Sequence, residues 1–533
     1  MRKRFQASGL PELESTCGKP NTKKERSGQY RDDTYSLRHV FAFSLVFRVV
    51  NSLLIRTYFN PDEHWQALEV AHRTVFGYGH LTWEWRRGLR GYLHPLVFSF
   101  LYKGLQITGL DMPWCMTRMP RMLQSLFAAV GDLYLYKLAL ALFGGTVAKW
   151  ALFSQMVNWF VFFCLDRTLS NSLEAVLTLV GLYYWPCMRP GGNDASTSRK
   201  IGLTVAAFAC AIRPTSVITW IYVGLLELSR ARDRHRFLLE VLSIGTLMLG
   251  ITCVLDRLMH SYWVLVPLNF FKFNFLSSGG NRYGTHAWHW YISQGFPVML
   301  FTFLPFSVAG AMNSSGGGHI SVLVCWVLAV YSLMAHKEFR FIFPVLPLAL
   351  IHSGFSLAAM ERHEHQARGR GRGALRMAVV FLLVTNIPMA LYMSLVHQRG
   401  AEDVMIYLSR EAKMKREITS VLFLMPCHST PYYSALHSNV TMRILDCSPP
   451  QSPGVVSESD RFLMDPVGFV SNLAIDWRAN TPPSHIVLFD TEEKKIRDLL
   501  ASCSFIEAKR FFHAHFKVDR DLQASVVLYV SAR

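Results

Sequence analysis

The stretch "HVFAFSLVFRVVNSLLIRTYFNPDEHWQ", His39 to Gln66, determines the class of fold. Its first part, through Ile55, is an apolar run long enough to cross a hydrocarbon core of ~30 Å as a helix. Two adjacent carboxylates, Asp62 and Glu63, follow that run almost directly. Ionised side chains are costly near hydrocarbon, so two acids at the mouth of a first transmembrane helix indicate a function.

The composition extends this reading to most of the chain. Of 533 residues, 51% are hydrophobic and only 17% are charged, whereas soluble domains carry about a quarter charged residues. The apolar residues come in blocks, so the sequence predicts a polytopic α-helical membrane protein. About eleven transmembrane helices are expected, at residues 38–56, 119–142, 148–165, 171–188, 200–212, 215–229, 236–255, 297–312, 319–335, 340–359 and 375–396.

The charges predict the topology. The net charge of +18 comes from lysines and arginines in short segments between apolar blocks, which is the positive-inside pattern and argues against nucleic-acid binding. Residues 1–37 are polar and basic with no apolar core, so we expect a cytosolic, disordered tail rather than a signal peptide. An odd number of spans then places the C-terminus in the lumen.

Three luminal regions follow from this count: two loops within the transmembrane domain (38–396), at about 56–118 and 260–296, and a C-terminal domain, 397–533. In that domain "SVLFLMPCH", "HIVLFD" and "SVVLYVS" predict strands, and "TEEKKIRDLLASC" has helical spacing. We therefore expect a small α/β domain.

The luminal assignment has consequences for modification. In an oxidising lumen Cys427 and Cys447 can form a disulfide. The sequon at Asn439 is expected to be glycosylated, whereas the sequon at Asn313 lies in a loop expected on the cytosolic side.

Asp62 and Glu63 have two interpretations. After Asn60-Pro61 they suit the first turn of a helix, where negative charge is favoured. A carboxylate at a membrane boundary can also take a proton from a sugar hydroxyl that attacks an electrophile. Asp62 is the preferred base and Glu63 the alternative.

A second cluster is "HKEFRFIFP", His336 to Pro344. Lys337 and Arg340 can be interfacial anchors, or they can bind a donor phosphate together with His336 by charge-assisted hydrogen bonds. Arg213, in the expected helix break "AIRPTS", is a further candidate for this phosphate site.

A third cluster is "NRYGTHAWHWY", Asn281 to Tyr291. Its aromatic residues suit a membrane-interface belt, or stacking on sugar rings. His286 and His289 have no evident third ligand nearby, so no metal site is expected. The residues predicted to bind the substrate sugars are His286, Trp288, His289, Trp290 and Tyr283, together with Trp83 and Glu84 in the first loop.

A luminal base, a luminal phosphate cradle and a luminal sugar platform suit glycosyl transfer from a lipid-linked sugar phosphate. A phosphate is a weakly basic leaving group, so cations rather than a general acid stabilise its departure. A single displacement would invert the anomeric centre.

Several of these segments resemble the glycosyltransferase family 22 mannosyltransferases of the endoplasmic reticulum. The resemblance rests on "NPDEHWQ", "YGHLTWEW", "TLSNSLE", "YGTHAWHWY" and "HKEFRFIFPVLP", and it covers about residues 38 to 533. It implies the GT-C glycosyltransferase fold, dolichyl-phosphate mannose as the donor substrate, no further cofactor or metal, and catalysis by the acidic pair.

The segment "MPCHSTPYYS", Met425 to Ser434, narrows the resemblance to the members that build glycosylphosphatidylinositol (GPI) anchors. The implied reaction adds the third mannose, in α1,2 linkage, to a mannosylated glucosaminyl-phosphatidylinositol. The alternatives are a dolichol-linked oligosaccharide mannosyltransferase of the same family, and a lipid transporter, against which the clustering of polar residues on one membrane side argues.

Overall fold

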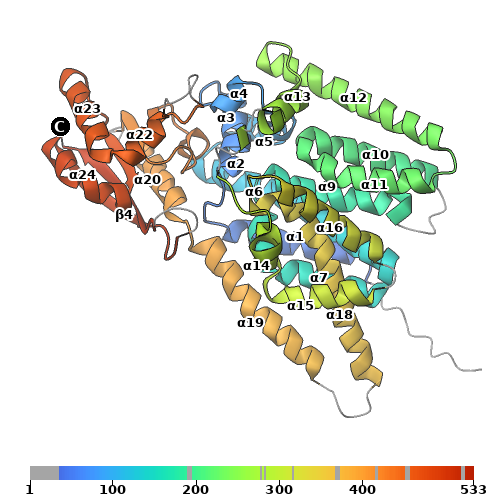
Figure 1. Ribbon diagram of the computed structural model, residues 1–533. Coiled ribbons are helices and arrows are strands. Elements are labelled where there is room, and N and C mark those ends of the chain that lie inside the picture. Colours follow the sequence, from blue (N-terminus) through green and yellow to red (C-terminus); the bar gives the residue numbers. More distant parts are fainter. Residues whose placement is uncertain are drawn as a thin grey trace, which may run out of the picture.

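The computed structural model describes residues 35–188, 195–276, 279–280, 284–314, 317–366, 373–414, 418–449, 456–517 and 522–532. Figure 1 shows a large body of helices and, at one end of it, a smaller body that contains a sheet. The expected combination of a helical membrane part with a small C-terminal α/β domain is confirmed.

The membrane part is built from helices of very different lengths. They are α1 (Leu37–Leu54), α6 (Pro113–Phe143), α7 (Gly145–Val157), α8 (Trp159–Cys164), α9 (Ser170–Tyr184), α10 (Ala195–Ile212), α11 (Val217–Arg230), α12 (Arg234–His260), α14 (Phe296–Leu300), α15 (Leu304–Asn313), α16 (Gly318–Leu333), α17 (Phe339–Ile342), α18 (Leu346–Gln366) and α19 (Ala374–Leu395).

Shorter helices fill the two long loops. The first loop contains α2 (Pro61–Glu63), a π-helical segment (His64–Leu68), α3 (Glu69–Phe76), α4 (Trp83–Arg86) and α5 (Leu93–Thr108), and the second contains α13 (Val266–Phe271).

Each expected span overlaps at least one helix, and six helices in the described part of the chain are long and apolar enough to cross a membrane. Three of these expectations are wrong in that the span is not one continuous α-helix. Spans 297–312 and 340–359 contain the 3₁₀ turns Phe301–Phe303 and Phe343–Val345. Span 148–165 is interrupted because the chain leaves the helix at Asn158. The Asn158 side chain accepts a hydrogen bond from the backbone N–H of Val161 (3.0 Å) and so caps the new helix α8. Several other helices are shorter than the spans expected for them.

The predicted break at "AIRPTS" is confirmed. A single 3₁₀ turn, Pro214–Ser216, separates α10 from α11, and Arg213 before it has extended backbone angles. Proline cannot continue the hydrogen bonding of α10, which is why the chain turns there.

Polar contacts and close backbone approaches hold the helices together. Arg48 of α1 binds Asp132 of α6 through two hydrogen bonds of 2.8 and 2.9 Å, with both side chains fully buried. At Gly354 of α18, an added Cβ would overlap the backbone of Ala151 in α7. Such small residues let membrane helices approach closely.

The C-terminal domain contains a five-stranded sheet in the order β2-β1-β3-β5-β4. Strands β1, β2 and β3 are parallel, and β5 is antiparallel to both β3 and β4. The predicted strands are confirmed as β1 (Ser420–Leu424), β3 (His485–Phe489) and β5 (Ser525–Ser531), and the predicted helix as α24 (Asp490–Ser502); β2 (Thr441–Ile444) and β4 (Phe505–Phe512) were not expected.

The two faces of this sheet have different neighbours. One face packs against α22 (Glu458–Met464), α23 (Pro466–Ala479) and α24. The other face packs against α20 (Gly400–Met414), α21 (Tyr433–Leu436) and, from the first loop, Trp65. The C-terminal domain therefore shares a hydrophobic core with the loop that carries the acidic pair.

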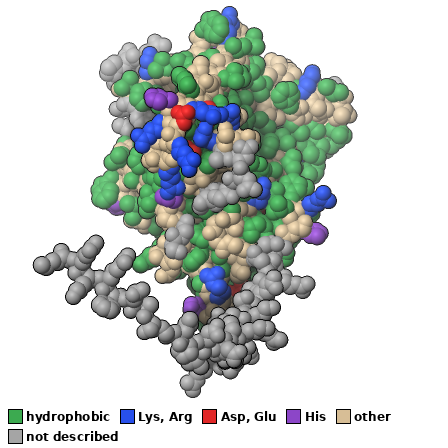
Figure 2. Space-filling model, turned by 90° about the vertical axis from the view of Figure 1, so that its right-hand side faces the viewer, with side chains coloured by type: hydrophobic (Ala, Val, Ile, Leu, Met, Phe, Trp, Pro, Cys, Tyr) green, Lys and Arg blue, Asp and Glu red, His purple; other side chains and the backbone are tan. Residues whose placement is uncertain are grey.

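Figure 2 shows the end of the helical body that lies away from the sheet. Basic side chains gather on this face among hydrophobic ones, with few acidic side chains. This distribution is the one that the positive-inside rule gives for a cytosolic face.

Replacement of Gly354 by alanine should destabilise the helical body. The added methyl group meets backbone, which cannot rotate away, so we expect a loss of about 1–3 kcal/mol. Gly250→Ala in α12, where an added Cβ has nothing within 4 Å, is the matched control. Thermal unfolding in detergent measures both variants, and equal melting temperatures would contradict the close approach of α7 and α18.

Candidate active site

The helix that carries the acidic pair begins at Pro61. The Asn60 side chain accepts a hydrogen bond from the backbone N–H of Asp62 (3.0 Å), and both acids lie in the first turn. The capping interpretation is therefore confirmed. From His64 to Leu68 the helix is of the π type, which is rare and is found mostly at functional sites.

Asp62 lies at a cavity of about 560 Å³, a volume that includes open solvent. The wall also contains Arg90, His94 and Arg213, and on its apolar side Val266 and Phe270. The Asp62 side chain is 13% exposed, and Oδ2 is paired with Arg340 and lies 3.8 Å from Arg90. A carboxylate with two cations beside it thus faces an open cavity.

The charges around Asp62 form a chain of alternating sign. On one side, Arg90 is held by the Glu84 carboxylate at 2.8 Å. On the other side, Arg340 donates two hydrogen bonds to Glu338, of 2.6 and 2.8 Å. Glu338 also accepts from Asn60 (2.9 Å), so the helix start and the "HKEFRF" segment are tied together.

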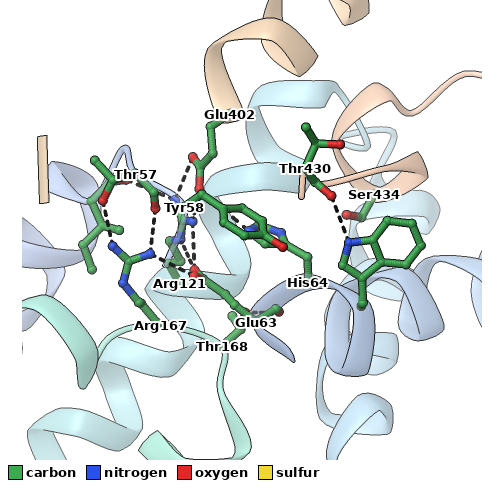
Figure 3. Close-up of polar contacts among 12 residues, drawn as sticks. Thr57, Tyr58, Glu63, His64, Arg121, Arg167, Thr168, Glu402, Thr430 and Ser434 are labelled. Carbon is green, nitrogen blue, oxygen red and sulfur yellow. Dashed lines mark hydrogen bonds and ion pairs between the residues drawn. The ribbon is translucent and has the colours of Figure 1, made fainter. Parts of the chain in front are cut away.

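Glu63 has a different environment from its neighbour. It is fully buried and does not line this cavity. Its carboxylate is held at 2.8 Å by Arg121 of α6 and at 2.8 Å by Arg167, which follows α8 (Figure 3). Thr168 donates to the Glu63 backbone carbonyl as well (2.8 Å). These contacts give Glu63 the role of fixing the helix rather than of meeting substrate.

The pKa values of the two acids reflect these surroundings. Burial raises the pKa of Asp62, but the nearby Arg340 and Arg90 outweigh burial and hold it below its usual value. Burial also acts on Glu63, and Arg167 and Arg121 bring its pKa to about 2. Both acids are therefore ionised at neutral pH, and only Asp62 reaches the cavity.

Glu63, His64 and Glu402 have the spacing of a metal site, since ligand atoms from all three lie within 4.8 Å of one another. Arg121 binds both carboxylates, and Arg167 binds Glu63. Two guanidinium groups thus balance the two acids, so this cluster is an ion-pair network and does not fit a bound cation.

The "HKE" segment holds the aromatic segment in place. The Lys337 ammonium donates to the carbonyls of His286 (3.2 Å) and Met334. His336 is hydrogen-bonded through Nδ1 to the carbonyl of Gly284 and through Nε2 to Glu338, both at 2.9 Å. Neither side chain lines the cavity, in contrast to the phosphate-binding role expected for both.

The aromatic segment lies on the surface beside the "HKE" segment. His286, Trp288 and His289 are exposed, Trp288 by 68%. His286 stacks on Trp290, with ring centroids 4.7 Å apart. Tyr283, also expected to bind sugar, lies outside the described residues. These rings are available for stacking but are not part of the cavity wall at Asp62.

The remaining predicted residues divide between the cavity and its support. Arg213 lies in the cavity wall and is held by Glu174, with 3.4 Å between Nε and Oε2. Glu84 is buried and positions Arg90. Trp83 is half-buried, packs against Phe273 with ring centroids 5.5 Å apart, and does not line the cavity.

The segment Met425 to Leu436 docks the C-terminal domain onto the acidic helix. Trp65 Nε1 donates to the carbonyl of Thr430 (2.9 Å; Figure 3). Glu69 accepts from the backbone N–H groups of Tyr432 (2.9 Å) and Ser434 (3.1 Å). Burial raises the pKa of Glu69 to about 7. From α20, Glu402 reaches Arg121, so the domain also completes the charge network around Glu63.

A disulfide joins Cys427, in the segment Met425 to Leu436, to Cys447, which follows β2. This is the pair expected from the sequence. Asn439, the candidate glycosylation site, is exposed and lies just before β2.

Sequence reasoning missed five charged residues of the site, namely Arg90, Arg121, Arg167, Glu338 and Glu402. Two signals were available. Arg167 interrupts an apolar run, and Arg90 and Arg121 are arginines on the side expected to be luminal, where the positive-inside rule predicts few.

The fold is that of the GT-C membrane glycosyltransferases. The chain superposes on ArnT from Cupriavidus metallidurans bound to undecaprenyl phosphate with a TM-score of 0.59 and 13% identity, covering 93% of this chain and 98% of that one. It also superposes on the oligosaccharyltransferase of Archaeoglobus fulgidus with a TM-score of 0.51 and 11% identity, covering 93% and 76%.

Residues 39–437 match the Alg9-like mannosyltransferase family, and the chain belongs to that family. It is therefore a membrane mannosyltransferase. The chain is 61% identical over 510 residues to mannosyltransferase APTG1 of Arabidopsis thaliana, covering 93% of this chain and 92% of the relative. It is 40% identical to GPI alpha-1,2-mannosyltransferase 3 of Mus musculus (93% and 89% covered) and 38% identical to GPI mannosyltransferase 3 of Yarrowia lipolytica (95% and 99%).

Replacement of Glu63 by glutamine should destabilise the protein. Removal of one partner leaves buried guanidinium groups without a full counter-charge, which costs about 3–5 kcal/mol. We expect a lower melting temperature and reduced abundance in membranes. Glu458→Gln, which breaks the ion pair with the exposed side chain of Arg443, is the control and should change little. A Glu63→Gln variant as stable as the wild type would show that Glu63 does not fix the helix.

Proposed function

We propose that this mannosyltransferase transfers mannose from dolichyl-phosphate mannose, in α1,2 linkage, to a mannosylated glucosaminyl-phosphatidylinositol as the third mannose of the GPI-anchor precursor. The proposal rests on one observation above all. A single carboxylate, Asp62, faces an open cavity whose wall also carries Arg90 and Arg213, and Arg340 is paired with it.

In this proposal Asp62 is the general base. The acceptor hydroxyl attacks the anomeric carbon, its proton passes to the Asp62 carboxylate, and the bond from that carbon to the phosphate oxygen breaks. Because attack and departure occur on opposite faces, the configuration inverts. Asp62 is available in the ionised form because its pKa lies below the usual value.

The cations beside Asp62 suit the leaving phosphate. Arg90 and Arg213 both line the cavity, and guanidinium groups bind phosphate oxygens through paired hydrogen bonds. Val266 and Phe270 supply an apolar side wall, which suits the isoprenoid part of the donor. Lys337 and His336 then act by holding the aromatic segment, whose exposed rings are suited to stack on acceptor sugars.

The acceptor and linkage are proposed from the names of relatives aligned over most of the chain. The alternative is an α-mannosyltransferase of dolichol-linked oligosaccharides, which the family match alone would also allow. The arrangement favours an endoplasmic reticulum membrane location, with a cytosolic N-terminus and with the active site and C-terminal domain in the lumen.

Asp62→Asn should abolish transfer while the protein remains folded, because an amide keeps the shape but cannot accept the proton. Loss of a general base typically costs about 10²–10⁴-fold in rate. The control is Asp111→Asn, which removes the same charge from a residue of the same loop outside the cavity wall. The measurement is mannose transfer per folded molecule in membranes. Near wild-type activity for Asp62→Asn would assign the base elsewhere.

Cells that lack this protein should accumulate a GPI precursor with two mannoses. Mass spectrometry of extracted glycolipids tests donor class, acceptor and step together, and re-expression of the wild type should restore the third mannose. Accumulation of a truncated dolichol-linked oligosaccharide instead would support the alternative acceptor.

Asn439 should carry an endoglycosidase-sensitive glycan, since it is exposed in the proposed luminal domain. Asn313 should carry none, because it ends α15 on the proposed cytosolic side. Asn439→Gln is the control for the mobility shift on gels. A glycan at Asn313 would invalidate the topology.

A further inference from the structure

A second cavity lies on the other side of the helix that carries Asp62. Residues 62 and 66 line the first cavity, whereas His64 and Leu68 line the second, which measures about 380 Å³ with open solvent included. Two residues along a helix are about 200° apart around its axis, so one short helix separates the two spaces. The second cavity is not used by the reaction proposed above.

The polar lining of this cavity is suited to an anion. It includes Thr117, Arg118 and Arg121 of α6, together with His64 and Glu402. His64 is 5% exposed, and within the described part of the chain neither ring nitrogen has a hydrogen-bond partner. Nε2 lies 3.8 Å from the Glu402 carboxylate, which leaves Nδ1 for a ligand. A buried imidazole that lines a cavity can donate one N–H to a ligand there.

The arginines around the second cavity outnumber the acidic side chains that pair with them. Arg121 and Arg167 are balanced by Glu63 and Glu402, and Arg399 pairs with Asp403 at 2.7 Å.

Two arginines remain. Arg118 donates to the carbonyl of Ile55 (2.6 Å), and that is its one side-chain hydrogen bond among the described residues. Arg56 is exposed and has no side-chain hydrogen bond or ion pair within those residues. Because Arg118 is bound to the carbonyl of the residue that precedes Arg56, the two arginines lie beside each other. Glu402, in the same cavity wall, is already paired with Arg121.

The surroundings of Arg56 and Arg118 indicate a lipid. Arg56 directly follows α1, whose last turns expose Val50 (53%) and Leu53 (37%). Arg118 lies one turn after Trp114, which is 56% exposed. Arg56 thus follows the end of one membrane helix, and Arg118 lies in the second turn of another, one turn inside an exposed tryptophan of the kind found at membrane interfaces. Both positions are at the depth of lipid headgroups.

We propose that Arg56 and Arg118, with His64 deeper in the cavity, bind the phosphate of an anionic membrane lipid on the same side of the membrane as Asp62. The positive-inside rule does not account for arginines on the proposed luminal side. The phosphate can belong to a resident phospholipid or to the lipid end of the acceptor. The site does not depend on the donor or linkage proposed above.

Lipid binding without turnover tests the site. The full-length protein is placed in nanodiscs of phosphatidylcholine with increasing phosphatidylinositol, and native mass spectrometry counts the phosphatidylinositol that is retained. Each arginine contributes a charge-assisted contact, so Arg56→Gln and Arg118→Gln should each reduce retention about tenfold, and the double variant more. Arg410→Gln, at an exposed arginine on α20, is the control and should retain wild-type binding.

Arg118→Lys separates lost binding from misfolding. Lysine keeps the positive charge but lacks the planar guanidinium group, so this variant should retain part of the binding. Retention by the folded double variant equal to the wild type would overturn the proposal. Lipid retention does not require mannose transfer, so it can also be measured for Asp62→Asn. Failure of the proposed reaction and failure of the lipid site therefore give different results.

The source of the phosphate follows from transfer kinetics. If the acceptor supplies it, Arg56→Gln should raise KM for the acceptor and leave KM for the donor unchanged. If a resident phospholipid supplies it, both KM values should stay constant, and added phosphatidylinositol should raise the melting temperature of the wild type but not of the double variant. Absence of both effects would contradict the site.

Discussion

The arrangement of the candidate active site depends on one buried interaction, the ion pairs that Arg121 and Arg167 form with Glu63. Two guanidinium groups are placed out of contact with water, and such charges are tolerated only with full counter-charge. Glu63 supplies one acid, and Glu402 from α20 supplies the other. Four segments that are distant in sequence must therefore meet at this point, and the meeting fixes the start of the helix that carries Asp62.

This constraint explains how two adjacent acids have different roles. Successive side chains on a helix point about 100° apart, so when Glu63 is held inward, Asp62 is turned to the cavity. Arginines stabilise the ionised form of both acids. Exposure, rather than charge state, therefore separates them: Asp62 is open to the cavity, and Glu63 is fully buried.

The membrane helices and three of the five strands could be predicted from the sequence. The other strands and the contacts of the site could not, for physical reasons. Apolar blocks locate the membrane helices, and the buried strands β1, β3 and β5 read as apolar runs. Strand β4 was missed because its middle is exposed and charged, and β2 because only alternate residues are partly buried.

Pairings such as Glu402 with Arg121 join residues far apart in the chain, and no local pattern records them. Lys337 was assigned to phosphate because a lysine in sequence does not show that its partners are backbone carbonyls.

The C-terminal domain is packed into the candidate active site rather than attached beside it. Trp65 of the acidic helix completes the core on one face of the sheet, and Glu69 holds the segment that follows β1. The family match ends at residue 437, so it includes α20 and the docking segment but stops before β2. The shared part thus contains every group that holds Glu63. The strands beyond it complete the sheet, which keeps α20 in place and so keeps Glu402 on Arg121. In this way the C-terminal sheet fixes the direction of the Asp62 carboxylate.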